Sequence, residues 1–229
     1  MGTMNDLGVE LRFGIPAYRF ALPAGWVRHV PTNAAQEDDI KRASAIFRQA
    51  NRPDLDAEFR GLMAQTGQAM ARTKVFAIYR QEQVELDELL PMSITASALS
   101  AADGENLDGW VSDAFRTKGA QFLDEDAQHI VRWRSEPQRP QGARRIDGVS
   151  GRTLTYVIPA PGTQRRKALV FTTTIVVPDG DVIPAEIVDA LELLSDGMIS
   201  TFTWESELEE PVLPAAPAKD SEADPTDGE

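Results

Sequence analysis

Cysteine is absent from this sequence of 229 residues. A disulfide framework, a thiolate nucleophile and a thiolate metal site are therefore excluded. Histidine is nearly as scarce, because His29 and His129 are the only two in the chain. Histidine is the side chain whose charge changes most readily near neutral pH. The two histidines fall on separate predicted strands without metal-ligand spacing, so we expect neither a metal site nor a bound cofactor.

Long apolar runs are also missing. No segment approaches the roughly 18 consecutive apolar residues that a membrane span needs. Residues 1–10 lack a basic stretch followed by an apolar run, which is the pattern of a signal peptide. We therefore expect a cytoplasmic protein without a membrane span.

Motifs that carry catalytic chemistry are missing as well. The run Gly148–Gly151 has neither the Gly-x-Ser-x-Gly order nor the strand-turn-helix setting of a nucleophile elbow. The acidic loops at residues 103–106 and 179–181 do not follow the twelve-residue calcium pattern. No Gly-rich phosphate loop occurs in the chain. We therefore expect a protein that is not an enzyme.

Acidic residues dominate the charge, and the formal net charge is −13 at pH 7. Residues 205–229 contain nine acidic residues and one lysine, a net charge of −8, together with four prolines. Such a segment cannot bury enough apolar surface to offset the entropy lost on ordering it. We predict a disordered acidic tail over 205–229, and we expect no nucleic-acid partner for so acidic a chain.

The remaining residues, 1–204, are expected to form a single domain, because 42% of the chain is hydrophobic and suffices for one sizeable core. Apolar residues recur at every third or fourth position in two early stretches. Pro53 stands between them, at a favoured first helical position. We predict that residues 34–72 form a helical hairpin inserted into the domain.

Strand patterns follow the hairpin. Residues 90–98 alternate apolar and polar side chains, which is typical of a strand with one face in water. Turn signals such as Asp147-Gly148 separate the later strands. An early strand is predicted at residues 9–13, before the hairpin. The other strands are predicted at residues 74–80, 128–135, 143–146 continuing through the turn into 152–159, and 167–177. We expect the last of these to be the central strand, covered on both faces.

Two further helices are predicted, one capped by Asp103 and one running from Pro184 to Phe202. In the second, five apolar residues lie on one stripe that only Gly197 interrupts, and they are Ile187, Leu191, Leu194, Met198 and Phe202. Tight turns produce antiparallel strand pairs, and the helices must bury their stripes on the resulting sheet. The sequence therefore predicts an α+β fold, with an antiparallel sheet of about six strands packed between helices.

The most informative stretch is residues 18–27, a strand that alternates, breaks at Pro23 and Gly25, and delivers a tryptophan into the next strand. It is a structural signature and contains no reactive group. The tryptophans fall on core-facing positions of their elements, and we expect most of them to be packed in the core. These residues are Trp26, Trp110, Trp133 and Trp204.

This opening, the turn Ile146-Asp147-Gly148 and the ending Met198–Phe202 together resemble the PsbP-like (Mog-type) family. The resemblance covers most of residues 18–204 and implies a curved antiparallel sheet between helices. The family is largely non-enzymatic and includes a photosystem subunit, a binder of a small GTPase, lipoproteins, and chaperones that hold secreted effectors. The present chain differs by its helical insertion at 34–72, and no lipoprotein signal is visible in it. The matching motifs are all framework, so the resemblance assigns no functional residue.

One basic stretch stands out, because residues 129–167 hold nine basic and two acidic side chains, a net charge of +7. Arg132 and Arg134 share one face of their strand, and neighbouring strands can add Thr153 and Thr155 to it. We predict that these four residues form a polar, positively charged face that binds a partner protein.

A structural role for the arginines is the alternative. In that interpretation the helical hairpin covers the basic face, and its acidic residues Glu37, Asp38 and Asp39 pair with the arginines. The two interpretations differ in what a charge reversal would do, because an exposed face loses binding and a covered face loses stability.

Two functions remain open. The absence of catalytic motifs and the family resemblance favour a non-enzymatic protein-binding module, an adaptor or chaperone-like protein that uses a sheet face or the helical hairpin. The alternative is a small-molecule-binding or hydrolytic domain with a site assembled in space near His129. A deep pocket with a carboxylate beside His129 would favour the alternative, whereas a shallow exposed apolar groove would favour the binding module.

Overall fold

The computed structural model describes residues 12–49, 51, 53–82, 84, 88–123, 129–135, 149–178 and 184–205. In this part of the chain a seven-stranded sheet has the order β2-β3-β4-β8-β7-β6-β5, and a two-stranded sheet pairs β1 with β9. The strands are β1 (Tyr18–Arg19), β2 (Trp26–His29), β3 (Val75–Gln81), β4 (Met92–Ser100), β5 (Gln121–Phe122), β6 (Val131–Ser135), β7 (Val149–Pro159), β8 (Lys167–Pro178) and β9 (Thr203–Trp204). The helices are α2 (Asn33–Gln49), α3 (Pro53–Arg72), α4 (Asp108–Lys118) and α5 (Ala185–Ser200).

The large sheet is antiparallel throughout. Strand β8 lies fourth of the seven, between β4 and β7, so the predicted central position of residues 167–177 is confirmed. The expectation that both faces of this strand are covered is wrong at its end, where Val176 is 42% exposed. The α+β class is confirmed too, with one strand more than expected in the main sheet and a small second sheet beside it. No described helix has the length and apolar character that crossing a membrane requires.

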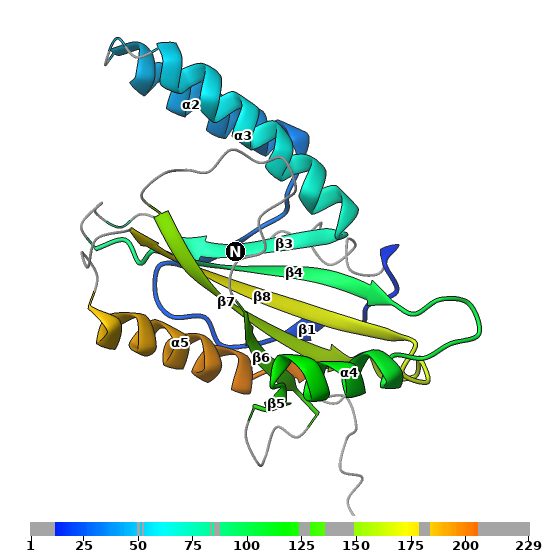
Figure 1. Ribbon diagram of the computed structural model, residues 1–229. Helices are drawn as coiled ribbons and strands as arrows, with labels where there is room; N and C mark the ends of the chain where they lie inside the picture. Colours follow the sequence, from blue (N-terminus) through cyan, green and yellow to red (C-terminus); the bar gives the residue numbers. More distant parts are fainter. Residues whose placement is uncertain are drawn as a thin grey trace, which may run out of the picture.

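Helix α5 covers one face of this sheet (Figure 1). The strands beneath it alternate as predicted, since β4 buries every second side chain from Met92 to Ala98. Leu191 and Met198 of α5 are buried against this face, and Phe202 is buried just beyond the helix end. The predicted stripe of the last helix is therefore confirmed at these three positions. Leu194 is partly buried against the same core, whereas Ile187 is 48% exposed, so the prediction is wrong at Ile187.

The opening stretch completes the same core. Tyr18 of β1 stacks on Phe202, with ring centroids 5.7 Å apart, and Phe20 packs edge-on against Phe171 of β8 at 5.1 Å. After Phe20 the chain leaves the strand, turns at Gly25 with φ of 80°, and enters β2 at the buried Trp26. A positive φ of this kind is readily adopted only by glycine, which explains the residue at this turn.

Helix α4 covers part of the opposite face. Leu107 and Ala114 pack there against Trp133 of β6. The helix begins at Asp108, with Leu107 at the cap position, so the predicted cap at Asp103 is wrong. Just before the helix, the side chain of Asn106 accepts a hydrogen bond from the Asp108 N–H at 3.0 Å.

The tryptophan prediction holds for three of the four residues, and Trp110 of α4 is the exception. Trp26, Trp133 and Trp204 are buried, whereas Trp110 is 37% exposed. Its ring instead packs edge-on against Trp133, with the centroids 5.5 Å apart.

Helices α2 and α3 form the predicted hairpin, which projects beyond the β2–β3 edge of the sheet (Figure 1). The Thr32 hydroxyl accepts a hydrogen bond from the Ala35 N–H and so caps the start of α2. Asn51 turns the chain with φ of 53°, a conformation that asparagine tolerates better than most residues. Pro53 then opens α3 as predicted.

Other predictions concern residues outside the described part of the chain. These are the strand 143–146, the turn at Asp147-Gly148, and residues 206–229 of the tail. An early strand at residues 9–13 is not formed over its described end, where Phe13 lies in a turn.

Candidate functional site

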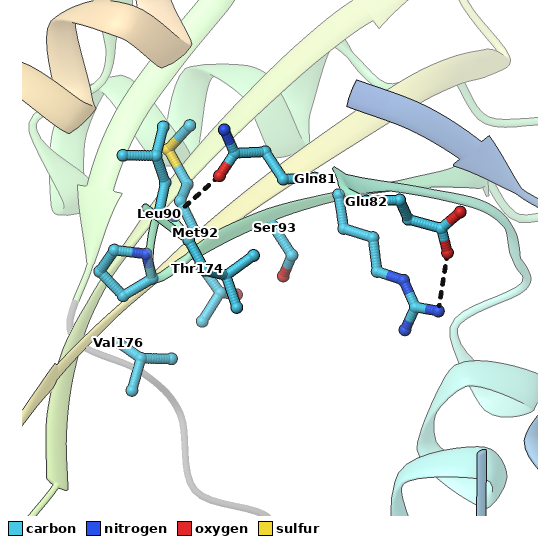
Figure 2. A pocket seen from close by; sticks show the side chains of 10 residues that line it. Gln81, Glu82, Leu90, Met92, Ser93, Thr174 and Val176 are labelled. Carbon is cyan, nitrogen blue, oxygen red and sulfur yellow. Dashed lines mark hydrogen bonds and ion pairs between the residues drawn. The ribbon is translucent and has the colours of Figure 1, made fainter. Parts of the chain in front are cut away.

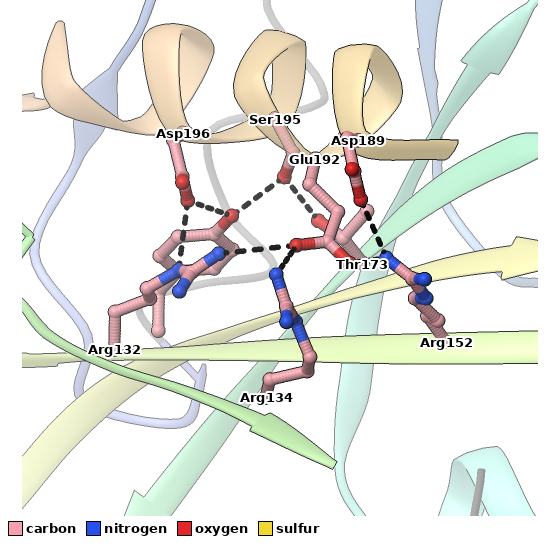
Figure 3. Close-up of polar contacts among 9 residues, drawn as sticks. Arg132, Arg134, Arg152, Thr173, Asp189, Glu192, Ser195 and Asp196 are labelled. Carbon is pink, nitrogen blue, oxygen red and sulfur yellow. Dashed lines mark hydrogen bonds and ion pairs between the residues drawn. The ribbon is translucent and has the colours of Figure 1, made fainter. Parts of the chain in front are cut away.

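Arg132 and Arg134 of β6 lie on the face of the sheet that α5 covers (Figure 3). The Arg132 Nε donates to Asp196 Oδ1 at 3.0 Å, and its Nη2 lies 3.5 Å from Glu192 Oε2. The Arg134 Nη2 also pairs with Glu192 Oε2. Both partners belong to α5, so this helix holds the two predicted arginines.

Glu192 is the common acceptor of the network. Only 3% of the residue is exposed, and besides the two β6 arginines it receives Arg152 Nη1 of β7 at 2.9 Å. The same Arg152 nitrogen lies 2.8 Å from Asp189. These hydrogen bonds, with Glu192 first, raise the pKa of Arg152. A buried carboxylate is tolerated only when its charge is compensated in this way.

A chain of hydroxyl groups continues the network into the core. Tyr156 donates to Asp196 Oδ1 at 2.7 Å, so its only proton is used there. Ser195 lies 2.8 Å from the Tyr156 oxygen and must donate to it, and Thr173 lies 2.7 Å from Ser195 and donates in turn. Burial and the nearby Asp196 charge raise the pKa of Tyr156. The hydroxyl chain therefore ends on an ionised carboxylate and favours neutral tyrosine.

Thr153 and Thr155 lie on the opposite face. The register pairs Trp133 with Thr155, and it pairs Arg134 with Leu154, so the threonines share the face of Trp133 and not that of the arginines. The expectation that all four residues share one face is therefore wrong. Among the described residues no side chain forms a hydrogen bond with either threonine.

The alternative, in which the helical hairpin covers the arginines, is also wrong about the covering element. The carboxylates that meet Arg132 and Arg134 come from α5, and they are Glu192 and Asp196. Exposure differs between the two arginines, since 12% of the Arg132 side chain and 55% of the Arg134 side chain are exposed. Arg132 is thus built into the domain, whereas Arg134 reaches its surface.

His129 lies exposed just before β6. Within the described segments no ion pair joins it to a carboxylate, and no group of three or more histidine, aspartate or glutamate side chains could hold a metal ion. The other histidine, His29, has its Nε2 3.0 Å from Oε1 of Glu82, just after the neighbouring strand β3 ends. The deep site that would favour a hydrolytic or small-molecule-binding domain is therefore not formed around His129 by these residues.

Two hollows do occur on the described surface. The first, about 420 Å³, lies where β3, β4 and β8 meet, and Figure 2 shows its lining. There the Gln81 side chain accepts the Leu90 N–H at 2.7 Å, and Ser93 faces Thr174 across the strands. This lining fixes the chain that enters β4 and contains no histidine.

The second hollow is a shallow apolar groove of about 540 Å³ between residues 21–23 and the outer side of α5. Leu193 lies beside it and is 73% exposed, the highest value among the exposed large apolar side chains of the described chain. This groove is the feature that the sequence analysis named as favouring a binding module. It was not predicted, because the whole apolar stripe of α5, Leu194 included, was interpreted as buried on the sheet.

Comparison with known proteins gives distant structural likenesses alone. No family model matches the chain, and no curated protein matches it. Among solved structures, the Ran-binding protein Mog1p of Saccharomyces cerevisiae is 13% identical with a TM-score of 0.35, over 56% of this chain and 78% of that one. A mutant of Mog1 is also 13% identical, with a TM-score of 0.37, over 56% of this chain and 78% of that one.

Cyanobacterial PsbP from a Synechocystis species is 14% identical with a TM-score of 0.36, over 89% of this chain and 90% of that one. Mog1 and PsbP are the proteins after which the family that the sequence resembles is named. At these TM-scores the likeness carries no argument about function, so the proposals below rest on the residues of this chain.

Proposed function

We propose that this protein is a non-enzymatic binding module that holds another protein, as an adaptor or chaperone does, with the hairpin α2–α3 as its docking arm. The observation that carries the proposal is the position of the hairpin, which projects from the sheet edge (Figure 1), with none of its described side chains in either core cluster. An element placed in this way is free to contact a partner.

The fold does not need the hairpin to connect its strands. The hairpin joins β2 to β3, and these are already antiparallel neighbours with His29 opposite Ile78. Antiparallel neighbours can be joined by a loop of about two to five residues. The helices α2 and α3 are therefore additional to the sheet.

The hairpin also carries its own internal contacts. Ser44 of α2 is fully buried and donates to Asp56 of α3, while Arg60 Nη2 donates to the Ser44 hydroxyl at 2.7 Å. The hydrogen bond from Ser44 is the main cause of a lowered Asp56 pKa. A preformed arm loses less conformational entropy on binding than a disordered segment does, which supports a docking role.

Thr153 and Thr155 remain part of the proposal as a polar sheet face without side-chain partners in the described chain. Their hydroxyls can donate to and accept from a partner backbone. Arg134 stays in the proposal for its exposed guanidinium, and Arg132 for holding the strand that presents it.

The test is a variant in which residues 33–72 are replaced by a four-residue Gly-Asn turn. Affinity purification from the native organism, quantified by mass spectrometry, compares this variant with the full chain, and calorimetry with the recombinant partner follows. We expect the variant to unfold cooperatively with a melting temperature within about 5 °C of the full chain. We also expect it to bind the purified partner at least tenfold more weakly.

A double variant, Thr153→Val with Thr155→Val, is the matched test of the sheet face, because valine keeps the shape and removes the hydroxyls. Undiminished binding by the variant without the hairpin would contradict the docking arm. Loss of the fold on removing 33–72 would contradict it equally, because the hairpin would then be structural.

A further inference from the structure

The groove beside α5 is an apolar surface at the edge of the core. Ala190, Leu193, Leu194 and Gly197 of α5 line it at helical spacing. Leu194 also packs partly against the core, and the buried Met198 lies at the base of the groove, whereas Ala190, Leu193 and Gly197 are exposed. The apolar surface of α5 therefore continues from its buried stripe onto a side that does not pack on the sheet.

Gly197 sets the shape of this groove. Glycine inside a helix is less stable than alanine by about 1 kcal/mol. A Cβ added at Gly197 would meet no heavy atom within 4 Å beyond its own helix backbone and chain neighbours, and its φ is not positive. Neither packing nor backbone conformation therefore requires glycine there. Because glycine has no side chain, it leaves space beside Ala190 in which another backbone can approach α5 closely.

The charges around the groove indicate which kind of partner could bind there. Helix α5 contains Glu186, Asp189, Glu192 and Asp196 and no basic residue. Glu192 and Asp196 are taken up by the sheet arginines, whereas Glu186 is exposed and Asp189 keeps 65% of its side chain exposed beside its pairing with Arg152. The groove is thus apolar with carboxylates beside it.

Two occupants from this chain are disfavoured by the same charges. A second copy would bring another acidic α5 against this one, and the whole chain has a net charge of −13. Residues 205–229, with a net charge of −8, would be repelled as well. Strand β1, which leads to the groove, contains one basic residue. This is Arg19, two positions before Ala21 in the groove lining.

We infer that this groove binds a helix of a partner protein that is apolar on the side facing α5 and basic on its flanks. Apolar residues at three- and four-residue spacing on α5 match a helix laid along it, and the small residues Ala190 and Gly197 allow the two axes to come close. Lysine or arginine on the partner would meet Glu186 and Asp189. This surface is separate from the α2–α3 hairpin, so the inference does not depend on the proposed docking arm.

The test uses fluorescence anisotropy with three labelled 18-residue peptides. The first is an amphipathic helix with leucines on one side and lysines on the other, the second carries glutamate in place of lysine, and the third is a scrambled form of the first. We expect the basic amphipathic peptide to bind at least tenfold more tightly than either of the other two. The variant that lacks residues 33–72 should bind it as the full chain does, which separates this inference from the proposed function.

Three variants of unchanged net charge test the location. Leu193→Gln removes the exposed apolar side chain, and Gly197→Leu is designed to fill the groove from a position where an added Cβ meets no heavy atom within 4 Å. Each substitution should weaken the binding of the basic amphipathic peptide at least tenfold. The helical circular-dichroism signal of the protein should stay unchanged. Leu89→Gln, at another exposed leucine, is the control and should not change the affinity.

Equal binding by all variants would overturn the inference, because the peptide would then be attracted by the overall negative charge alone. Failure of the basic amphipathic peptide to bind the full chain would overturn it too. Self-association in analytical ultracentrifugation that Leu193→Gln abolishes would assign the groove to a second copy, against the inference.

Discussion

Glu192 of α5 and Arg152 of β7 form an ion pair across the interface between helix and sheet, with Oε1 and Nη1 2.9 Å apart. Glu192 also receives Arg132 and Arg134, so one buried carboxylate joins α5 to two strands. Removing one member of a buried ion pair leaves the charges of the others uncompensated. The pairing therefore fixes which side of α5 faces the sheet, and leaves the groove side outward.

The first prediction concerns this carboxylate. Glu192→Gln keeps the shape of the side chain and removes its charge, and we expect the free energy of unfolding to fall by about 3 kcal/mol. The control Asp189→Asn affects an ion pair that is largely exposed and should change it by less than about 1 kcal/mol. Urea denaturation midpoints measure both, and equal midpoints for the two variants would contradict the central role of Glu192.

The second prediction reverses the arginines. Arg132→Glu with Arg134→Glu places new carboxylates against Glu192 and Asp196, and we expect a loss of at least about 3 kcal/mol of stability. Adding Glu192→Arg with Asp196→Arg should recover part of that loss. Adding Glu37→Lys with Asp38→Lys on the hairpin should recover none. Recovery by the hairpin changes would show that these helices, and not α5, meet the arginines.

The sequence patterns predicted the strands of the sheet well. They predicted less well which helix contacts each face of the sheet. Alternation in β4 and the stripe of α5 depend on residues close in the chain, so both could be predicted. The pairing of Arg132 with α5 joins positions 64 residues apart, and no local pattern decides between that helix and the hairpin. One signal was available: Asp189, Glu192 and Asp196 recur at helical spacing next to the buried stripe.

The error about Thr153 and Thr155 has a simple origin. Neighbouring side chains in a strand point to opposite faces, and a shift of one residue between two strands moves every side chain to the other face. The residues of β7 that lie opposite Arg132 and Arg134, and share their face, are Tyr156 and Leu154. Register of this kind depends on strand pairing, which the sequence pattern of one strand does not contain.

The third prediction concerns pH and Tyr156. Its pKa is raised by burial first and by the Asp196 charge second, so the folded protein keeps the neutral form where the unfolded chain ionises. An unfolded tyrosine loses its proton near pH 10, so its contribution to stability is complete below that pH and declines as pH rises through it. Tyr156→Phe should lower stability by about 1 to 2 kcal/mol at pH 7.

The quantity to measure is the difference in stability between the wild-type chain and Tyr156→Phe, because the two chains share every other titratable group. Thermal unfolding at pH 8 and at pH 10.5 should show the stability advantage of the wild-type chain shrinking at the higher pH. An advantage of the same size at both values would mean that the Tyr156 hydroxyl ionises equally in the folded and unfolded states.

The fourth prediction concerns the hairpin. The Ser44 hydroxyl is the main cause of the lowered Asp56 pKa, and Arg60 adds to it. The contribution of Asp56 to hairpin stability is therefore present above its unfolded pKa of 3.8 and is lost as pH falls through the lower, folded value. Ser44→Ala should move the Asp56 pKa upward, which NMR titration of the side-chain carboxyl measures directly. Arg48→Gln, which removes the weakest of the contributing charges, is the control and should move it less.

The last prediction compares two leucines two positions apart on α5. Leu191 is 4% exposed on the sheet side, and Leu193 is 73% exposed beside the groove. Leu191→Ala leaves a cavity in the core and should lower the free energy of unfolding by about 2 to 5 kcal/mol, as should Phe202→Ala at the helix end. Leu193→Ala removes no core contact and should change it by less than about 0.5 kcal/mol. If Leu193→Ala proved as destabilising as Leu191→Ala in urea denaturation, the outer side of α5 would be packed and unable to bind a partner helix.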